Sequence, residues 1–251
     1  MGQVSTFTGS DVGVPLHAGS VINNGNGSYT INGGGNDIYV AADNFFYYYG
    51  SVTGLVWEAK MQVVSFDGPD IWSKVGLMVR RPNGVGTPPA TDDPEIMNLT
   101  TRAAGRNDTS DQHRPTRGVN TTDHQNLGPN GTSFPNTAPN MWLRITRTNA
   151  FFTLSYGTTG TTWTNYSSFS VFDTSGTANG FDGTVWENPI LLGVAVTAHN
   201  DADTNGKIES TESVSRAGES GAYTAKKASC REECGHIFVV TPKTGAVRLG
   251  G

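Results

Sequence analysis

The residues with the most specific chemical spacing in this sequence lie between positions 201 and 212. Oxygen-bearing side chains stand at positions 1, 3, 5 and 12 of a twelve-residue segment, and a glycine stands at position 6: Asp201, Asp203, Asn205, Gly206 and Glu212. This spacing matches a Ca²⁺-binding loop, in which the glycine allows a sharp turn and the last carboxylate binds with both oxygens. The carbonyl of Lys207 would supply a further ligand, and Glu209 would act directly or through a water molecule. The sequence therefore predicts calcium as a cofactor.

The residues before this loop predict a strand and not a helix. Residues 190–197 (ILLGVAVT) form a nearly continuous apolar run, as expected for a buried strand. A calcium sensor of the EF-hand type opens through the two helices that flank its loop. We therefore expect a structural ion that fixes how the chain leaves a sheet. The alternative is an acidic, Asn/Gly-rich surface turn that binds no metal.

Few residues suggest catalysis. Glycoside hydrolysis needs two carboxylates across the scissile bond, but Glu58 is the lone acid of its predicted strand. A second acidic group lies in a proline-rich connection and is expected to be solvated: Asp92, Asp93 and Glu95. The five histidines are scattered along the chain. We expect no enzyme activity, with a glycoside hydrolase as the weaker alternative.

Aromatic and basic residues outside the strand patterns are the candidates for binding a ligand. They are Trp72, Phe134, Phe181, Trp186 and, in a locally basic polar segment, Arg114. Aromatic rings combined with a few polar groups are typical of sugar-binding sites. Three further tryptophans lie within predicted strands and are expected in the core: Trp57, Trp142 and Trp163.

The elements that must position these residues are strands. Hydrophobic residues make up only 35% of the 251 residues, and glycines number 32, which favours many short strands joined by turns. Residues 55–63 alternate clearly, with apolar side chains on one face and Glu58, Lys60 and Gln62 on the other. Further strands are predicted at 20–32 (a hairpin), 45–50, 72–81, 96–103, 141–148, 151–156 and 161–171. Residues 105–139 are predicted to form a long polar loop.

These segments together predict an all-β fold, a two-sheet antiparallel β-sandwich. The net charge of −5 argues against a nucleic-acid partner, which would favour a basic surface. No apolar run approaches the ~20 residues that a membrane-spanning helix needs, so no membrane span is expected. The first residues also lack a basic and then apolar signal region.

Five blocks of sequence resemble one known family when they are taken in order. They are DVGVPLHAGS, NDIYVAADNFFYYYG, WSKVGLMVR, MWLRITRTNAFFTLSYGTTGTTWT and LLGVAVTAHN, which together span about residues 11–200. They are similar to bacterial concanavalin A-like lectin/glucanase sandwich domains, in the DUF1349 or "regulation of enolase"-like branch. The resemblance implies a jelly roll of two sheets. It also implies a non-catalytic, carbohydrate-binding, lectin-like domain that binds a glycan or polysaccharide, extracellularly or at a cell surface.

The C-terminal part departs from this family. We expect a sandwich over residues 1–200, a calcium loop over 201–212 and an extension with a β-hairpin over 213–251. The hairpin either completes the sandwich with residues 237–240 or pairs with a partner subunit by strand addition. The second possibility would make the protein a homo-oligomer, for example a structural subunit of a filament, sheath or virion shell. Cys230 and Cys234 leave open a local disulfide, two free thiols or part of a metal site with His236.

Overall fold

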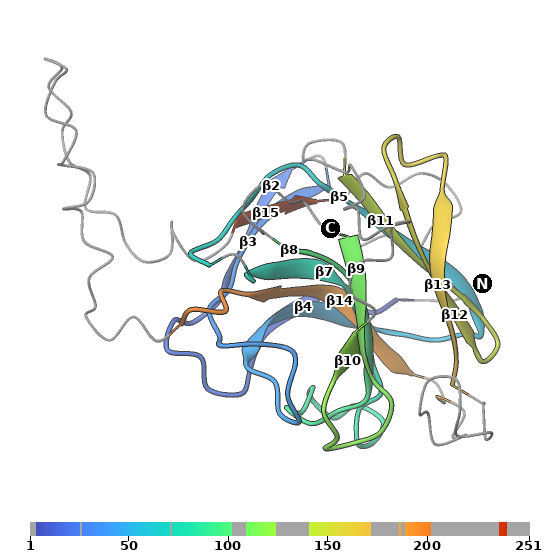
Figure 1. The fold of residues 1–251 in the computed structure, drawn as a ribbon, viewed down its shortest axis with the longest axis horizontal. Helices are drawn as coiled ribbons and strands as arrows, with labels where there is room; N and C mark the ends of the chain where they lie inside the picture. The colour runs from blue at the N-terminus through green and yellow to red at the C-terminus, as the bar shows by residue number, and fades with distance from the viewer. Residues whose placement is uncertain are drawn as a thin grey trace, which may run out of the picture.

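The structure is a computed structural model that describes residues 4–25, 27–70, 72–101, 109–123, 141–171, 186, 189–201 and 236–239. These residues form strands and turns (Figure 1), and none of them belongs to a helix. Within these ranges there is accordingly no helix long and apolar enough to cross a membrane. The fold is all-β and antiparallel, which confirms the predicted β-sandwich class.

One layer of the sandwich is a seven-stranded sheet in the order β1-β4-β14-β7-β8-β9-β10. In Figure 1, β4, β14 and β7 cross the middle of the molecule. The strands are β1 (Thr8–Val12), β4 (Phe45–Val52), β14 (Ile190–Thr197), β7 (Lys74–Arg80), β8 (Glu95–Thr101), β9 (Thr109–Arg114) and β10 (Thr122–Asp123). The central strands β7, β8 and β14 are buried along their whole length. A strand covered on both faces needs apolar or paired side chains throughout, which explains the unbroken run in β14.

Two four-stranded sheets form the other layer. The first has the order β13-β12-β11-β5, and the second has the order β2-β3-β15-β6. The strands are β5 (Val56–Val63), β11 (Met141–Thr148), β12 (Phe151–Gly157), β13 (Thr164–Ser170), β2 (Ser20–Gly25), β3 (Ser28–Asn32), β6 (Phe66–Asp67) and β15 (His236–Val239). Because β6 follows β5 after two residues and β15 lies beside both, these sheets adjoin each other.

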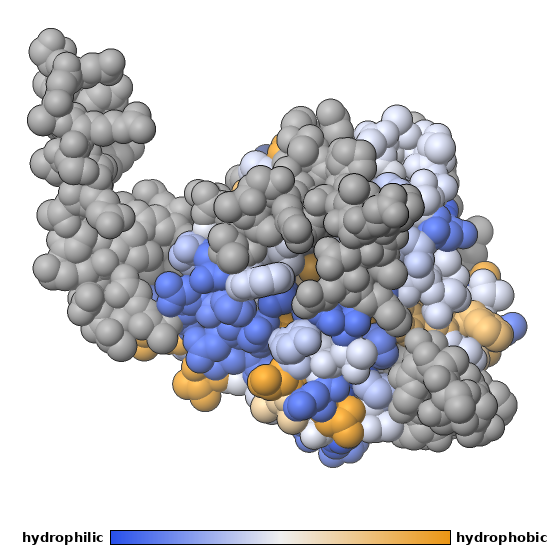
Figure 2. Space-filling view, viewed as in Figure 1, coloured by the Kyte–Doolittle hydropathy of each residue, from blue (hydrophilic) through white to orange (hydrophobic). Residues whose placement is uncertain are grey.

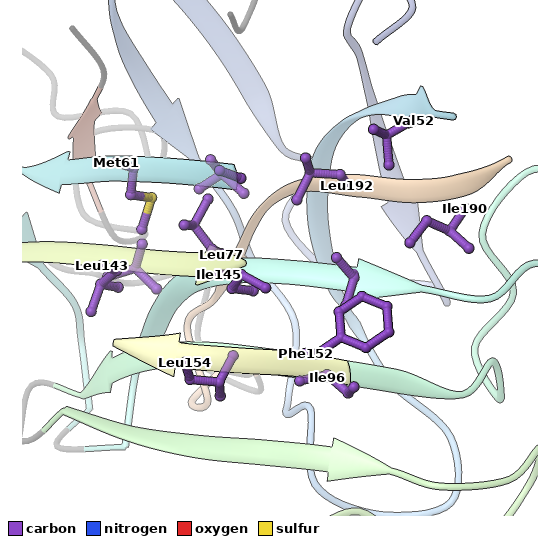
Figure 3. Close-up of a cluster of buried hydrophobic side chains, with 14 of the residues drawn as sticks. Val52, Met61, Leu77, Ile96, Leu143, Ile145, Phe152, Leu154, Ile190 and Leu192 are labelled. Carbon is purple, nitrogen blue, oxygen red and sulfur yellow. The ribbon is translucent and has the colours of Figure 1, made fainter. Parts of the chain in front are cut away.

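The main core lies between the two layers. Figure 3 shows side chains from β5, β11 and β12 pointing toward those from β7, β8 and β14, among them Leu143, Ile145, Leu77 and Leu192. In β5 and β11 every second residue is buried, so each strand turns one face to this core and the other outward. A second apolar cluster lies on the opposite face of the seven-stranded sheet and includes Phe45, Tyr47, Met78, Met97 and Ile38.

Several predicted strands are confirmed. The hairpin over 20–32 is β2 and β3, and β11 pairs with β12 around Asn149, whose φ of 56° lies in the left-handed region that a tight turn uses. The prediction of an uninterrupted polar loop over 105–139 is wrong, because β9 and β10 lie inside it. Strand β9 (TSDQHR) shows no apolar alternation, yet most of its residues are buried.

Many of the described residues at the surface are polar in the view that shows β9 and β10 at the front. Figure 2 shows hydrophilic residues across this view, with hydrophobic residues along the lower and right-hand margins. Several of the large hydrophobic side chains that are exposed lie in turns or at strand ends, such as Val14, Val85, Val56 and Phe151. Two of these, Val56 and Phe151, belong to the outer face of the sheet described next.

Candidate functional site

The outer face of the four-stranded sheet β13-β12-β11-β5 gathers polar and aromatic side chains in register. Strands β5 and β11 alternate strictly, so Trp57, Ala59 and Met61 enter the core while the residues between them point outward. Paired residues of neighbouring strands lie on the same face of a sheet. Two rows of this outer face matter here: Lys60, Arg144, Ser155 and Asn165 form one, and Gln62, Trp142 and Gly157 form the next.

Arg144 is the centre of a hydrogen-bonded group on this face. Its Nη2 donates to Ser155 Oγ and to Asn165 Oδ1, both at 3.1 Å. Its Nη1 lies 3.3 Å from Glu58 Oε2, and the other oxygen of Glu58 lies 2.9 Å from Lys60 Nζ. Ser155 Oγ donates to Asn165 Oδ1 at 2.8 Å. One carboxylate thus holds two cations in place, and the guanidinium group is fixed on three sides.

Trp163 covers part of this polar group. The centre of its ring lies 4.7 Å from Arg144 Cζ and 5.9 Å from Lys60 Nζ, within the range of cation–π attraction. The ring is neither fully buried nor fully exposed. Because strand β13 begins at the next residue, the turn over residues 158–162 determines where this ring lies.

The second tryptophan of the face, Trp142, packs against the same turn. A Cβ atom at Gly160 would lie 2.9 Å from its ring, and Gly160 has a φ of 70°. Both facts favour glycine, since any other residue would be strained in the left-handed region and would meet the indole. Trp142, like Trp163, is partly exposed. The turn and the sheet together therefore present two indole rings beside the hydrogen-bonded group around Arg144.

The core position expected for Trp142 and Trp163 is wrong, because both are partly exposed. Trp57 is buried as predicted, but Trp142 alternates with Met141 and Leu143 and so points outward with Arg144. The signal was present in MWLRITRT, where the apolar residues Met141, Leu143 and Ile145 occupy one parity and Trp142, Arg144 and Thr146 the other. Parity within the strand, and not membership of a strand, decides whether an aromatic residue is buried.

The first residue of the predicted calcium loop belongs to a separate group of polar contacts. Asp201 is buried, and its Oδ2 accepts a hydrogen bond from the backbone N–H of Leu16 at 2.6 Å. Its Oδ1 lies 2.8 Å from His17 Nδ1. Asp201 thus fastens the loop between β1 and β2 to the end of β14. The other predicted ligands lie outside the described residues: Asp203, Asn205, Lys207, Glu209 and Glu212.

Polar contacts also fix the residues just before Asp201. His199 has a φ of 64°, and its Nε2 and Nδ1 lie 3.3 Å from Asp37 Oδ2 and 3.2 Å from Asp70 Oδ1. The same Asp70 oxygen accepts the backbone N–H of Trp72, and Lys74 Nζ lies 2.5 Å from Asp37 Oδ1. No three His, Cys, Asp or Glu residues within the described ranges are arranged to hold a metal ion.

Trp72 is placed as the sequence suggested, with its side chain 43% exposed beside this group. Trp186, expected outside the core, is fully buried among the main core residues and packs 5.4 Å from Phe152 between ring centroids. Its carbonyl accepts a hydrogen bond from Arg147. A buried ring offers no face to a ligand, so its expected exposure is corrected. Phe134 and Phe181 lie outside the described residues.

Arg114, expected in a solvated loop, is also buried. It ends β9, and its guanidinium group binds both oxygens of Asp43, the second of which also accepts from Arg80 at 2.6 Å. Two buried cations therefore share one buried carboxylate. Glu95 lies in the same group, and burial, followed by the charge of Asp43, raises its pKa to about 8. This network holds the molecule together and is not open to a ligand.

No protein-family model and no curated protein matches the sequence. Among solved structures, the chain is similar to a functionally unknown protein from Saccharomyces cerevisiae, with a TM-score of 0.50 and 14% identity over 75% of this chain and 85% of that one. A weaker similarity to porphyranase B from Zobellia galactanivorans has a TM-score of 0.36 and 10% identity, over 87% of this chain and 76% of that one. The similarity to the yeast protein concerns the fold alone.

Proposed function

We propose that this protein is a non-catalytic, lectin-like carbohydrate-binding domain, and that it binds its ligand on the outer face of the sheet β13-β12-β11-β5. The observation that carries the proposal is the position of the Trp163 ring over Arg144, beside the outward-facing Trp142. The described acids of this face amount to Glu58, which already pairs with Lys60 and Arg144. A binding role is therefore favoured over hydrolysis, which needs two carboxylates.

The chemistry of sugars matches such a face. A pyranose ring has apolar patches of C–H groups that pack on aromatic rings, and hydroxyl groups that exchange hydrogen bonds at its edge. The indoles would supply the first contact, and Lys60, Arg144, Asn165 and Glu58 the second. Because Arg144 is already fixed by its neighbours, little conformational entropy would be lost when a ligand binds.

The wider assignment follows from the sequence resemblance. We infer that the chain belongs with the concanavalin A-like sandwich domains of the DUF1349 branch, and that it acts outside the cell or at its surface, where polysaccharides are found. We further propose a structural calcium ion over residues 201–212, next to the contacts made by Asp201. The charge balance makes a nucleic-acid partner an unsuitable ligand.

A glycan array with purified protein variants tests the proposal. Trp163→Ala and Trp142→Ala each remove an aromatic surface from the face and are expected to weaken binding about tenfold or more. Trp72→Ala is the matched control, because it removes an exposed tryptophan that lies outside the sheet β13-β12-β11-β5. The proposal fails if the wild-type protein binds no glycan, with or without calcium. It also fails if Trp72→Ala abolishes binding while the two sheet variants bind normally, which would move the site to the Trp72 loop.

A further inference from the structure

We propose that the ligand of this face is a neutral, linear polysaccharide of the ribbon-forming kind, lying lengthwise along β11 and β12, and not a single terminal sugar. This inference rests on the carbohydrate-binding function proposed above and adds the class and the direction of the ligand. Cellulose, xylan, mannan and chitin are polysaccharides of this class, since their equatorial linkages keep the chain extended and flat.

The face has a second apolar platform at the far end of the same strands. Thr148 pairs with Val56 on one side and with Phe151 on the other. Phe151 is 56% exposed and Val56 is 61% exposed, whereas the next residue of β12, Phe152, is in the core. Phe151 and Val56 therefore point outward on the same face as Trp142 and Arg144, and they form an apolar pair beside Thr148.

The spacing of the two platforms sets the length of the ligand. Trp142 and Thr148 are six residues apart on β11, which at the rise of an antiparallel strand is about 20 Å. A monosaccharide or disaccharide is too short to reach both platforms. An extended chain of several sugar units can rest on the indoles at one end and on Phe151 at the other.

Polar side chains fill the interval between the platforms. The row of Lys60, Arg144 and Asn165 lies next to the indoles, and the following row contains Glu58, Thr146, Thr153 and Ser168. Successive outward rows are about 7 Å apart along a strand. Hydroxyl groups of an extended chain would therefore meet donors and acceptors between the two platforms.

The charges of the face favour a neutral chain. Arg144 and Lys60 share the single carboxylate of Glu58, which compensates one of their two positive charges and pairs with both cations. A strongly anionic polysaccharide would have to compete with Glu58 for these cations. Two platforms at the ends of the same strands also suit an extended ribbon better than a helical polysaccharide, which would curve away from the second platform.

Isothermal titration with a chain-length series tests this inference. The probes are cello-, xylo-, manno- and chito-oligosaccharides from the disaccharide to the hexasaccharide. For the preferred series, we expect affinity to rise until the chain spans both platforms. We expect Phe151→Ala to weaken hexasaccharide binding about five- to tenfold and leave disaccharide binding unchanged. Trp163→Ala should weaken binding of both lengths, Phe151→Tyr should restore hexasaccharide binding, and Val85→Ala, which removes an exposed side chain elsewhere, should change neither.

The possible results distinguish a failure of the lengthwise-ribbon inference from a failure of the proposed carbohydrate-binding function. Affinity that does not depend on length, or a Phe151→Ala protein that binds the hexasaccharide normally, overturns the lengthwise ribbon and leaves carbohydrate binding standing. An equal loss for disaccharide and hexasaccharide in Phe151→Ala also overturns it, because a remote platform cannot affect a ligand that does not reach it. Binding only to helical or anionic glycans rejects the ligand class, and no binding to any glycan rejects the proposed function itself.

Discussion

Arg144 is a polar residue whose position is fixed by several partners at once. Its guanidinium group lies under the Trp163 ring and binds Ser155, Asn165 and Glu58. A lysine at this position could keep the charge but could not form the same planar set of contacts. The same principle applies inside the molecule, where Arg80 and Arg114 converge on Asp43.

Replacing Asp43 should be severely destabilising. Asp43→Ala would leave Arg80 and Arg114 buried without their shared carboxylate, and the expected loss in unfolding free energy is about 3–5 kcal/mol. Asp43→Asn keeps an acceptor oxygen without the charge and should cost less. Chemical denaturation measures both values. A loss below about 1 kcal/mol for Asp43→Ala would show that the two arginines find other partners.

Glu95 should make stability depend on pH. Its folded-state pKa is raised to about 8 by burial and by Asp43, above the ordinary value of 4.5. A raised pKa means that the folded state holds the proton more tightly, so this contribution to stability is fully present below about pH 4.5 and is lost as the pH rises through about 8. Glu95→Gln stays neutral at every pH. Between about pH 5 and pH 8 the wild-type protein should therefore lose more unfolding free energy than this variant, and equal slopes would contradict the shift.

Within each strand, the alternation of odd and even positions decides which residues face the core and which are exposed to a ligand. The sequence of β5 predicted its buried and exposed faces because every second residue is apolar. The same reasoning applied to β11 would have placed Trp142 outside, next to Arg144. Strand β9 could not be found in this way, because its buried residues are polar and gain their partners from distant segments, as Arg114 does from Asp43. Pairing between residues 71 positions apart leaves no periodic trace in the local sequence.

The turn over residues 158–162 is predicted to control the binding face. Gly160→Ala places a Cβ 2.9 Å from the Trp142 ring in a residue with a φ of 70°. The strain should cost about 1–2 kcal/mol of stability and displace the indole, so glycan affinity should fall as well. Gly118→Ala is a matched control, since its φ is 71° but its Cβ would meet nothing within 4 Å. Similar affinity in both variants would show that the turn does not position Trp142.

In the whole molecule, polar contacts at the end of β14 link segments that lie far apart in the sequence. Asp201 fastens the end of β14 to the loop after β1, and His199 lies between Asp37 and Asp70. Side-chain contacts within the protein therefore hold the segment after β14 in place as far as Asp201. The sequence predicted the strand and the acidic loop after it, but the link to Leu16 and His17 joins residues 185 and 184 positions apart and could not be seen in either segment alone.

Calcium should stabilise the folded protein in addition to these contacts. A ligand that binds only the native state stabilises it by about 2.7 kcal/mol at one hundred times its Kd, so calcium should raise the melting temperature. Glu212→Gln should remove this increase while leaving the protein in EDTA unchanged. Asp201→Ala should lower the melting temperature even in EDTA, because the contacts with Leu16 and His17 are lost. An unchanged wild-type melting curve on calcium addition would reject the metal site.

One titration tests whether the outer face of the sheet β13-β12-β11-β5 binds carbohydrate through Trp163. The affinity of wild-type protein and of Trp163→Ala is measured for the glycan that binds best on the array, with circular dichroism to confirm that both proteins are folded. We expect wild-type protein to bind and the folded variant to bind about tenfold more weakly or not at all. Equal affinity of the two folded proteins would contradict this expectation.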